Sequence, residues 1–265
     1  MTRPVYASAD RPIRCSSLTN LQKCAGFHVL ERGDVLSDGV DGSPASDLGR
    51  AVGRVIQLYH EGLTPGDAVL QAEREACDRF PQADLTVCRK LTMGYMADDR
   101  NPPMIATHCE LEVKLTIPAA PEDPTGLPIH LVGHIDQLRA DQAGRLFLWD
   151  VKNGQGSGLD LLYSHAWQLS AYTLAAAATL NRVVHPGGVI RTRAYEPAKS
   201  DPSVVSSMFR APWSLADCHS MMADVAFYVA HLRSGVIPVN PGVHCQWCPG
   251  VNPGNCARLL PAGAP

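Results

Sequence analysis

The sequence lacks a long apolar run and an excess of positive charge. No run approaches the ~20 consecutive apolar residues that a membrane-spanning helix needs, and the longest candidate, at 174–180, is a short alanine patch. The first ten residues lack a charged start followed by an apolar stretch, so we expect no secretory signal. The formal net charge of −3 argues against wholesale polyanion binding and leaves only a local basic groove. These absences exclude a membrane protein and make secretion unexpected.

The composition is that of an ordinary globular protein. The chain has 265 residues, of which 45% are hydrophobic and 18% charged, enough for a sizeable buried core. We expect one domain over residues 1–265. Nine cysteines are an odd number, and a disulfide framework is not expected in an intracellular chain. Four of the cysteines lie in periodic segments and are expected to fill the core: Cys77, Cys88, Cys109 and Cys218.

The hydrophobic pattern changes period along the chain. Up to about residue 96 its spacing is typical of helices, whereas from 105 to 117 mostly every second residue is apolar, which indicates a strand. The pattern predicts an α/β fold in which helices flank a mixed sheet of αβββαβ order. Predicted helices cover 17 to about 33, 46–59, a segment from 64, 83–96, 160–180 and 214–231, and predicted strands cover 105–117, 129–139, 145–152, 188–195 and 204–209.

Two strands of a predicted hairpin carry the most informative residues. Asp150 and Lys152 alternate along one strand and therefore point to the same face, and Asp136 on the partner strand can lie beside them. Two neighbouring carboxylates repel each other unless a cation lies between them, and Mg²⁺ or Mn²⁺ suits such oxygen ligands. A lysine beside the metal can stabilise charge on a phosphate. The alternative is a surface hairpin with exposed ion pairs.

The next predicted helix adds Gln168 and Tyr172, which lie four residues apart on one helical face. By themselves they would be read as part of an amphipathic helix with a half-buried tyrosine. Together, the strings GHIDQL (133–138), WDVKNG (149–154) and QLSAYTLA (168–175) resemble the PD-(D/E)XK nuclease superfamily, most closely its RecB-like branch of CRISPR-associated and phage-type exonucleases.

The resemblance implies a role for each of these residues. Asp136, Asp150 and the carbonyl of Val151 would hold Mg²⁺ or Mn²⁺, and Lys152 would be the catalytic lysine. Gln168 and Tyr172, counted with the catalytic set, would contact the DNA strand near the scissile phosphate.

One position departs from the sequence pattern of the RecB-like branch. Members of that branch usually carry Gly-x-x-x-His on an early helix, and the histidine binds metal. The best alignment in this chain, from Gly49 to Gly53, puts glycine in the histidine's place. His60 lies two turns further on the same face and could substitute as a ligand if the helix is shifted. The alternative is a solvent-facing histidine near the helix end.

The C-terminal segment contains a compact cysteine cluster. Cys245, Cys248 and Cys256 form a C-x₂-C-x₇-C pattern among prolines and glycines, and such thiolates can converge on one metal. Zinc with His244 is one alternative. RecB-like nucleases with a [4Fe-4S] cluster resemble this arrangement, which implies Cys24 as the fourth ligand, with Cys15 as the runner-up. Residues 16–33 and 238–258 would then form one metal-cluster subregion, the tail closing onto the N-terminal helix.

The resemblance therefore implies a metal-dependent DNA exonuclease, acting on single-stranded ends in recombination, repair or phage replication. It would work in the cytoplasm of a bacterial, archaeal or phage-infected cell, with recombination or replication proteins as partners. The rival is an inactive DNA-binding or scaffold subunit on the same fold, and a third hypothesis is a zinc-stabilised interaction protein. Basic residues that could follow a phosphate backbone, each also explicable as a surface charge, are Arg50, Arg54, Lys114, Arg191, Arg193 and Lys199.

Overall fold

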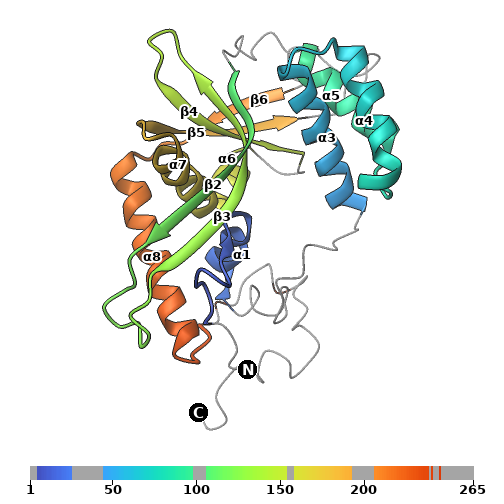
Figure 1. Cartoon of the computed structure of the whole chain (residues 1–265). Helices are drawn as coiled ribbons and strands as arrows, with labels where there is room; N and C mark the ends of the chain where they lie inside the picture. The colour runs from blue at the N-terminus through green and yellow to red at the C-terminus, as the bar shows by residue number, and fades with distance from the viewer. Residues whose placement is uncertain are drawn as a thin grey trace.

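The computed structural model describes residues 5–25, 44–97, 106–153, 158–192, 206–238, 240 and 245. In these residues a mixed sheet of six strands is flanked by seven helices (Figure 1). The α/β class predicted from the sequence is confirmed. The strands are β1 (Ile13–Arg14), β2 (Ala106–Ile117), β3 (Ile129–Ala140), β4 (Leu146–Lys152), β5 (Val184–Thr192) and β6 (Ser206–Arg210). The helices are α1 (Leu18–Lys23), α3 (Pro44–His60), α4 (Pro65–Arg79), α5 (Leu85–Ala97), α6 (Gly158–Ser164), α7 (Ala166–Leu180) and α8 (Leu215–Arg233), with a 3-10 turn η1 at Cys15–Ser17.

The sheet branches at β3. Strand β2 runs antiparallel along one edge of β3, and the other edge is shared by β1 at one end and β4 at the other. Strand β5 is parallel to β4, and β6 closes the sheet antiparallel to β5. The hairpin predicted from the sequence, β3 with β4, is therefore present.

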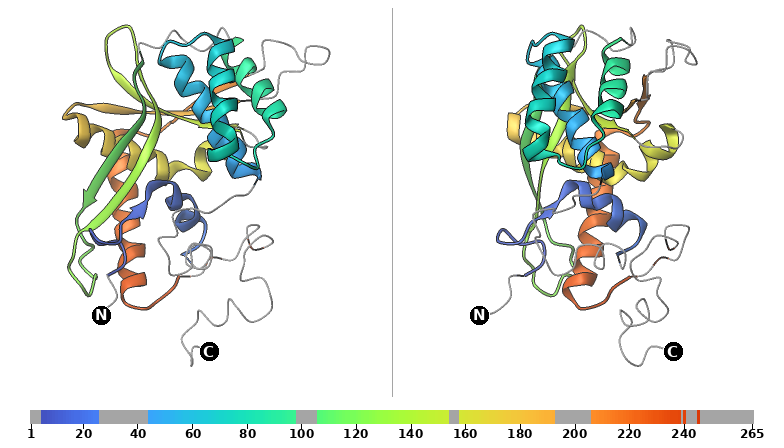
Figure 2. Two further views of the ribbon diagram at one scale, coloured as in Figure 1. Left: turned by 45° about the vertical axis from the view of Figure 1, so that its right-hand side comes forward. Right: turned by 90° about the vertical axis from the view of Figure 1, so that its right-hand side faces the viewer.

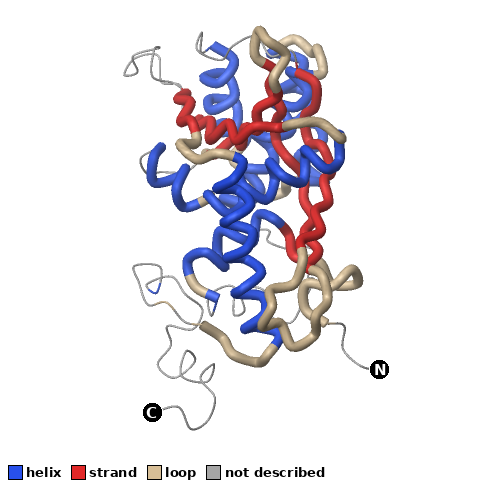
Figure 3. Tube along the Cα trace, turned by 90° about the vertical axis from the view of Figure 1, so that its left-hand side faces the viewer, coloured by secondary structure: helices blue, strands red, loops and turns tan. Residues whose placement is uncertain are grey.

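Helices cover the sheet on both faces. Helices α1, α7 and α8 pack on one face, and α3, α4 and α5 form a group on the other (Figure 2). Seen from the side of α8, the helices lie along the strand layer (Figure 3). Helix α7 is buried almost all round its first eleven residues, because it lies between the sheet and α8. No helix in the described part of the chain is long and apolar enough to span a membrane.

The protein has two hydrophobic cores, one under α7 and α8 and the other among α3, α4 and α5, and the β2–β3 pair contacts both. Ile135 belongs to the core under α7, whereas Gln137 and Arg139, which have the same parity, hydrogen bond to Tyr95 in the core of α3–α5. Side chains normally alternate along a strand, so residues of the same parity should share a face. The alternation is therefore interrupted near position 136, and residues of one parity change from one face of the sheet to the other. Glu110, the cross-strand neighbour of this point, has a positive φ of 53°.

Helix starts agree with the predictions where side chains form caps. Thr64 accepts a hydrogen bond from the backbone of Asp67, and Ser214 forms a reciprocal capping box with Asp217. Ser17, at the predicted start of the first helix, lies in the 3-10 turn and makes no capping hydrogen bond. That helix also ends earlier than predicted, at Lys23, because Cys24 adopts an extended conformation.

Two further boundaries differ from the prediction. The helix predicted at 160–180 is divided at His165, whose φ and ψ of −110° and 14° are not helical. Strand β5 begins at Val184, four residues before the predicted start at 188, even though Pro186 and Gly187 suggest a turn. A Cβ at position 187 would lie 2.0 Å from the carbonyl oxygen of Leu148, so glycine permits this close approach at a register shift.

Candidate active site

Acidic residues lie next to one another on three neighbouring strands. The β2–β3 register places Glu110 opposite Asp136, between recorded cross-strand pairs on either side. The β3–β4 ladder ends at Gln137, and one further step in the same register puts Asp136 opposite Asp150. Opposite residues share a face and have Cα atoms about 4.5–5.5 Å apart. Three carboxyl groups are thus carried in one row across the sheet.

Strands β3 and β4 separate at this row. Val151, the first residue of β4 beyond the row, donates its backbone N–H to Oδ2 of Asp136 at 2.6 Å. The backbone ladder between β3 and β4 ends at Gln137, and this side-chain hydrogen bond joins the two strands beyond that point. It fixes the Asp136 carboxylate against β4 and leaves the backbone of Val151 at the opening between the strands.

Asp150 and Lys152 form a largely buried ion pair. The Asp150 side chain is 3% exposed and that of Lys152 is 25% exposed, with Nζ 2.8 Å from Oδ2 of Asp150. This contact is an ion pair without hydrogen-bond geometry, and Asp150 Oδ2 has no hydrogen-bond partner in the structure. Burial lowers the pKa of Lys152, but the attraction of Asp150 and Asp136 outweighs it and raises that pKa overall. Lys152 is therefore cationic at neutral pH.

The electrostatics of Asp136 favour a positive partner. Burial, and then repulsion from Asp150, raise the pKa of Asp136 well above its usual range, although Lys152 and the Val151 N–H oppose this shift. The charged form is therefore disfavoured with only one lysine nearby. A cation at this place would offset the repulsion between the carboxylates.

A cavity of about 1040 Å³ opens beside these residues. Sequence reasoning missed two of its lining residues, Glu110 and His134, because their place depends on a strand register that no local pattern reveals. Gly53, predicted to occupy the place of a ligand histidine, also lines the cavity. The other residues at the wall that bear on the chemistry are Asp136, Val151, Lys152, Asn153, Arg50, Arg54 and Arg79.

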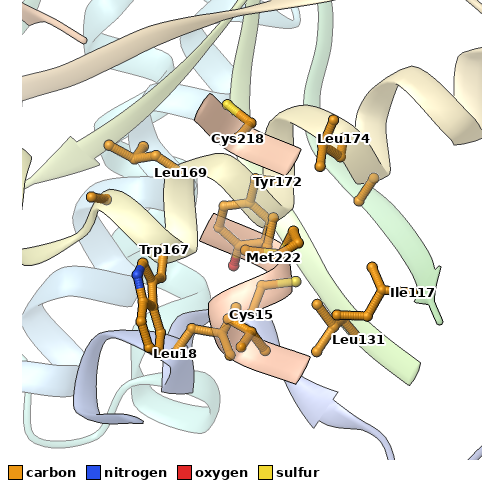
Figure 4. Packing of buried hydrophobic residues seen from close by; sticks show 14 of the residues in the cluster. Cys15, Leu18, Ile117, Leu131, Trp167, Leu169, Tyr172, Leu174, Cys218 and Met222 are labelled. Atoms are coloured by element: carbon orange, nitrogen blue, oxygen red, sulfur yellow. The ribbon is translucent and has the colours of Figure 1, made fainter. Parts of the chain in front are cut away.

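Gln168 and Tyr172 do not line this cavity. Gln168 is buried and accepts a hydrogen bond from Thr19 at 3.1 Å. Tyr172 is 5% exposed and lies in the core near Cys15 and Met222 (Figure 4). Its ring packs on β3 where Gly133 provides space, since a Cβ there would lie 2.7 Å from the ring. In this structure Tyr172 packs on β3 and Gln168 binds Thr19 of α1, and their contact with DNA stays a prediction.

His60 is not brought together with the acidic row. Its Nε2 is 2.7 Å from the hydroxyl of Tyr95, which also contacts Gln137 and Arg139. Burial, and then the charge of Arg139, lower the pKa of His60 to about 4. His60 is therefore neutral at pH 7 and part of a polar network in the α3–α5 core.

The predicted basic residues are mostly paired. Arg50 binds Asp47, Arg54 forms a two-bond ion pair with Glu75, and exposed Lys114 lies 3.3 Å from Glu112. Of the predicted basic residues that the structure describes, only Arg50 and Arg54 line the cavity. Arg191 lies on β5, and Arg193 and Lys199 lie outside the described residues.

The start of the C-terminal segment reaches the end of α1. Asn240 donates its backbone N–H to Cys24 Sγ at 3.3 Å and its side-chain amide to the carbonyl of Lys23 at 3.2 Å. Cys245 is described, whereas Cys248 and Cys256 lie outside the described residues. Within the described part, no three His, Cys, Asp or Glu side chains, those of the acidic row included, lie close enough to share a metal ion as they stand, so a cation held by the row would draw its side chains together.

Comparison with known proteins gives one family match. The model of the PD-(D/E)XK nuclease superfamily matches residues 13–251, a span that includes every described strand and the whole acidic row. No curated protein matches the chain. Among solved structures, one titled "Crystal structure of SSO0001" is similar at 14% identity and a TM-score of 0.35, covering 83% of this chain and 86% of that one.

Proposed function

Because this chain belongs to the PD-(D/E)XK nuclease superfamily, whose members are typically metal-dependent nucleases, we propose that it is a Mg²⁺- or Mn²⁺-dependent DNA exonuclease of the RecB-like branch. The single observation that carries the proposal is the arrangement of Asp136, Asp150 and Lys152 where β3 and β4 separate. We place its action on single-stranded ends, in cytoplasmic recombination, repair or phage replication.

The residues fit a divalent cation. Asp150 has a buried carboxylate oxygen without a hydrogen bond, and the pKa of Asp136 is raised first by burial and then by repulsion from Asp150. Carboxylate and carbonyl oxygens are the ligands that Mg²⁺ and Mn²⁺ take. Asp136, Asp150 and the carbonyl of Val151 would hold the ion.

Each residue has a defined task in phosphodiester hydrolysis. A divalent cation, when bound, neutralises phosphate charge and lowers the pKa of a bound water. The Val151 N–H holds the Asp136 carboxylate in place. Lys152, kept protonated by Asp150, supplies a fixed positive charge for the attacking hydroxide and for the negative charge that develops on the phosphate.

The function is tested with end-labelled and circular single-stranded DNA in Mn²⁺. We expect stepwise loss of linear DNA, circles left intact, and no activity for Asp150→Asn, which removes the buried charge while keeping the side-chain shape. Cleavage of circles would make the enzyme an endonuclease. An inert wild-type protein that binds DNA would support the scaffold alternative.

We also propose that Cys24, Cys245, Cys248 and Cys256 hold a [4Fe-4S] cluster. Support comes from the contact of Asn240 with Cys24, which brings the cysteine-bearing segment to the end of α1. A cluster there would link two segments far apart in sequence and make folding depend on metal.

Anaerobically purified protein is therefore expected to be brown and to contain iron and sulfide. Cys248→Ser should lose the colour and most of the iron, because a hydroxyl is a poorer ligand for iron than a thiolate. The control is Cys109→Ser, which changes a half-buried cysteine on β2. Colourless wild-type protein containing zinc would contradict the iron–sulfur assignment.

A further inference from the structure

Glu110 is a carboxylate in the active-site cavity that the roles above leave unused. It lines the same cavity as Asp136 and Lys152 and is half-buried there. Within the described residues its carboxylate has no hydrogen bond and no ion pair. Partial removal from water without a partner is unfavourable for a charged group. The side chain is therefore held where a ligand could use it.

The backbone at Glu110 is shaped for this position. Its φ of 53° is a left-handed conformation inside a twelve-residue strand, where an extended conformation is the norm. Such a conformation is unfavourable in a residue other than glycine and persists only where surrounding structure imposes it. In Glu110 this conformation lies where the side-chain alternation of the β2–β3 pair is interrupted. It places the carboxyl group in the row of Asp136 and Asp150.

Helix α3 leaves the carboxylate uncovered. Gly53, in the middle of α3, faces it, and a Cβ at that position would lie 3.7 Å from Oε1 of Glu110. A glycine within a helix is less favourable than an alanine. A larger side chain at position 53 would project over Glu110 and cover it where it lines the cavity.

We propose that Glu110 is the third carboxylate ligand of the divalent-cation site, on the side that faces Gly53. The inference rests on the proposed nuclease function, because it concerns the same cation. It is supported by the register that aligns Glu110 with Asp136 and Asp150, by the shared cavity, by its unpartnered carboxylate, and by the buried Asp150 oxygen that accepts no hydrogen bond.

The test is a titration of full-length protein with Mn²⁺, in which free ion is measured by electron paramagnetic resonance. Glu110→Gln keeps the size of the side chain and removes its charge, and we expect about 10–100-fold weaker Mn²⁺ binding, with a metal-free melting temperature no lower than that of the wild type. The matched control is Glu112→Gln, which changes an exposed glutamate two residues along the same strand and should bind Mn²⁺ as the wild type does.

Asp136→Asn separates the two hypotheses. If Asp136→Asn abolishes Mn²⁺ binding while Glu110→Gln binds as tightly as wild type, the role of Glu110 is wrong and the proposed function stands. If wild type binds no Mn²⁺, or Asp136→Asn binds it normally, the proposed function fails and this inference fails with it. Equal weakening in Glu110→Gln and Glu112→Gln would also overturn it, since a general loss of negative charge would then explain the effect.

Discussion

Replacing Lys152 by alanine is expected to slow phosphodiester hydrolysis about 10²–10³-fold, the usual effect of removing one group that stabilises charge in a transition state. Lys152 pairs directly with the acidic row, with Nζ 2.8 Å from Oδ2 of Asp150. The Asp150 carboxylate that it neutralises is 3% exposed, so the variant also leaves a buried charge without its partner. Metal-free Lys152→Ala should therefore melt at a lower temperature than the wild type.

Mn²⁺ should separate these two effects. Because the ion can take over the compensation of Asp150, the rise in melting temperature on adding Mn²⁺ should be larger for Lys152→Ala than for the wild type. Hydrolysis should stay slow at saturating Mn²⁺. The control is Lys114→Ala, since Lys114 is an exposed lysine on β2 that pairs with Glu112. Full hydrolysis by folded, Mn²⁺-saturated Lys152→Ala would refute the catalytic role of this lysine.

Replacing Arg233 by methionine is expected to destabilise the fold by about 3–5 kcal/mol, the cost of leaving one partner of a buried ion pair alone. The Arg233 side chain is 1% exposed, and its Nη1 lies 2.6 Å from Oδ2 of Asp123, which is 0% exposed. Its guanidinium also donates to the carbonyls of Tyr6, Leu127 and Pro128. One side chain at the end of α8 thus connects the N-terminal segment with the loop between β2 and β3.

Denaturant unfolding of the variants gives the measurement. Arg233→Met combined with Asp123→Leu should be less destabilised than Arg233→Met alone, because the second change removes the uncompensated carboxylate. Arg182→Met serves as the control, since Arg182 is an exposed arginine in the turn after α7. A loss below about 0.5 kcal/mol for Arg233→Met, the range of ordinary surface changes, would contradict the expectation.

The sequence predicts the strands well because their signals are local. Strand β2 starts at Ala106 and β3 and β4 end at Ala140 and Lys152, each within one residue of the prediction. The prediction fails where a distant contact decides the outcome. Pro186 and Gly187 read as a turn, yet they belong to β5, because Gly187 lets the strand approach the Leu148 carbonyl.

The same distinction applies to the site. Asp136, Asp150 and Lys152 could be found from a strand pattern and a short motif, and the structure brings them together. Glu110 could not, since its place depends on the register of β2 against β3. The burial of Tyr172 against Gly133 likewise depends on how α7 packs on the sheet, which helical spacing alone does not reveal.

The interrupted side-chain alternation in the β2–β3 pair has a consequence for local unfolding. On one side of the acidic row both strands belong to the core with α7, and on the other side Gln137 and Arg139 of β3 hydrogen bond to Tyr95 of α5. Detachment of α3–α5 would therefore break the hydrogen bonds of Tyr95 with Gln137 and Arg139 and expose these two residues. Both lie on the strand that carries Asp136. Because β3 contacts both helix groups, we expect loosening of either group to disturb the strand that carries Asp136.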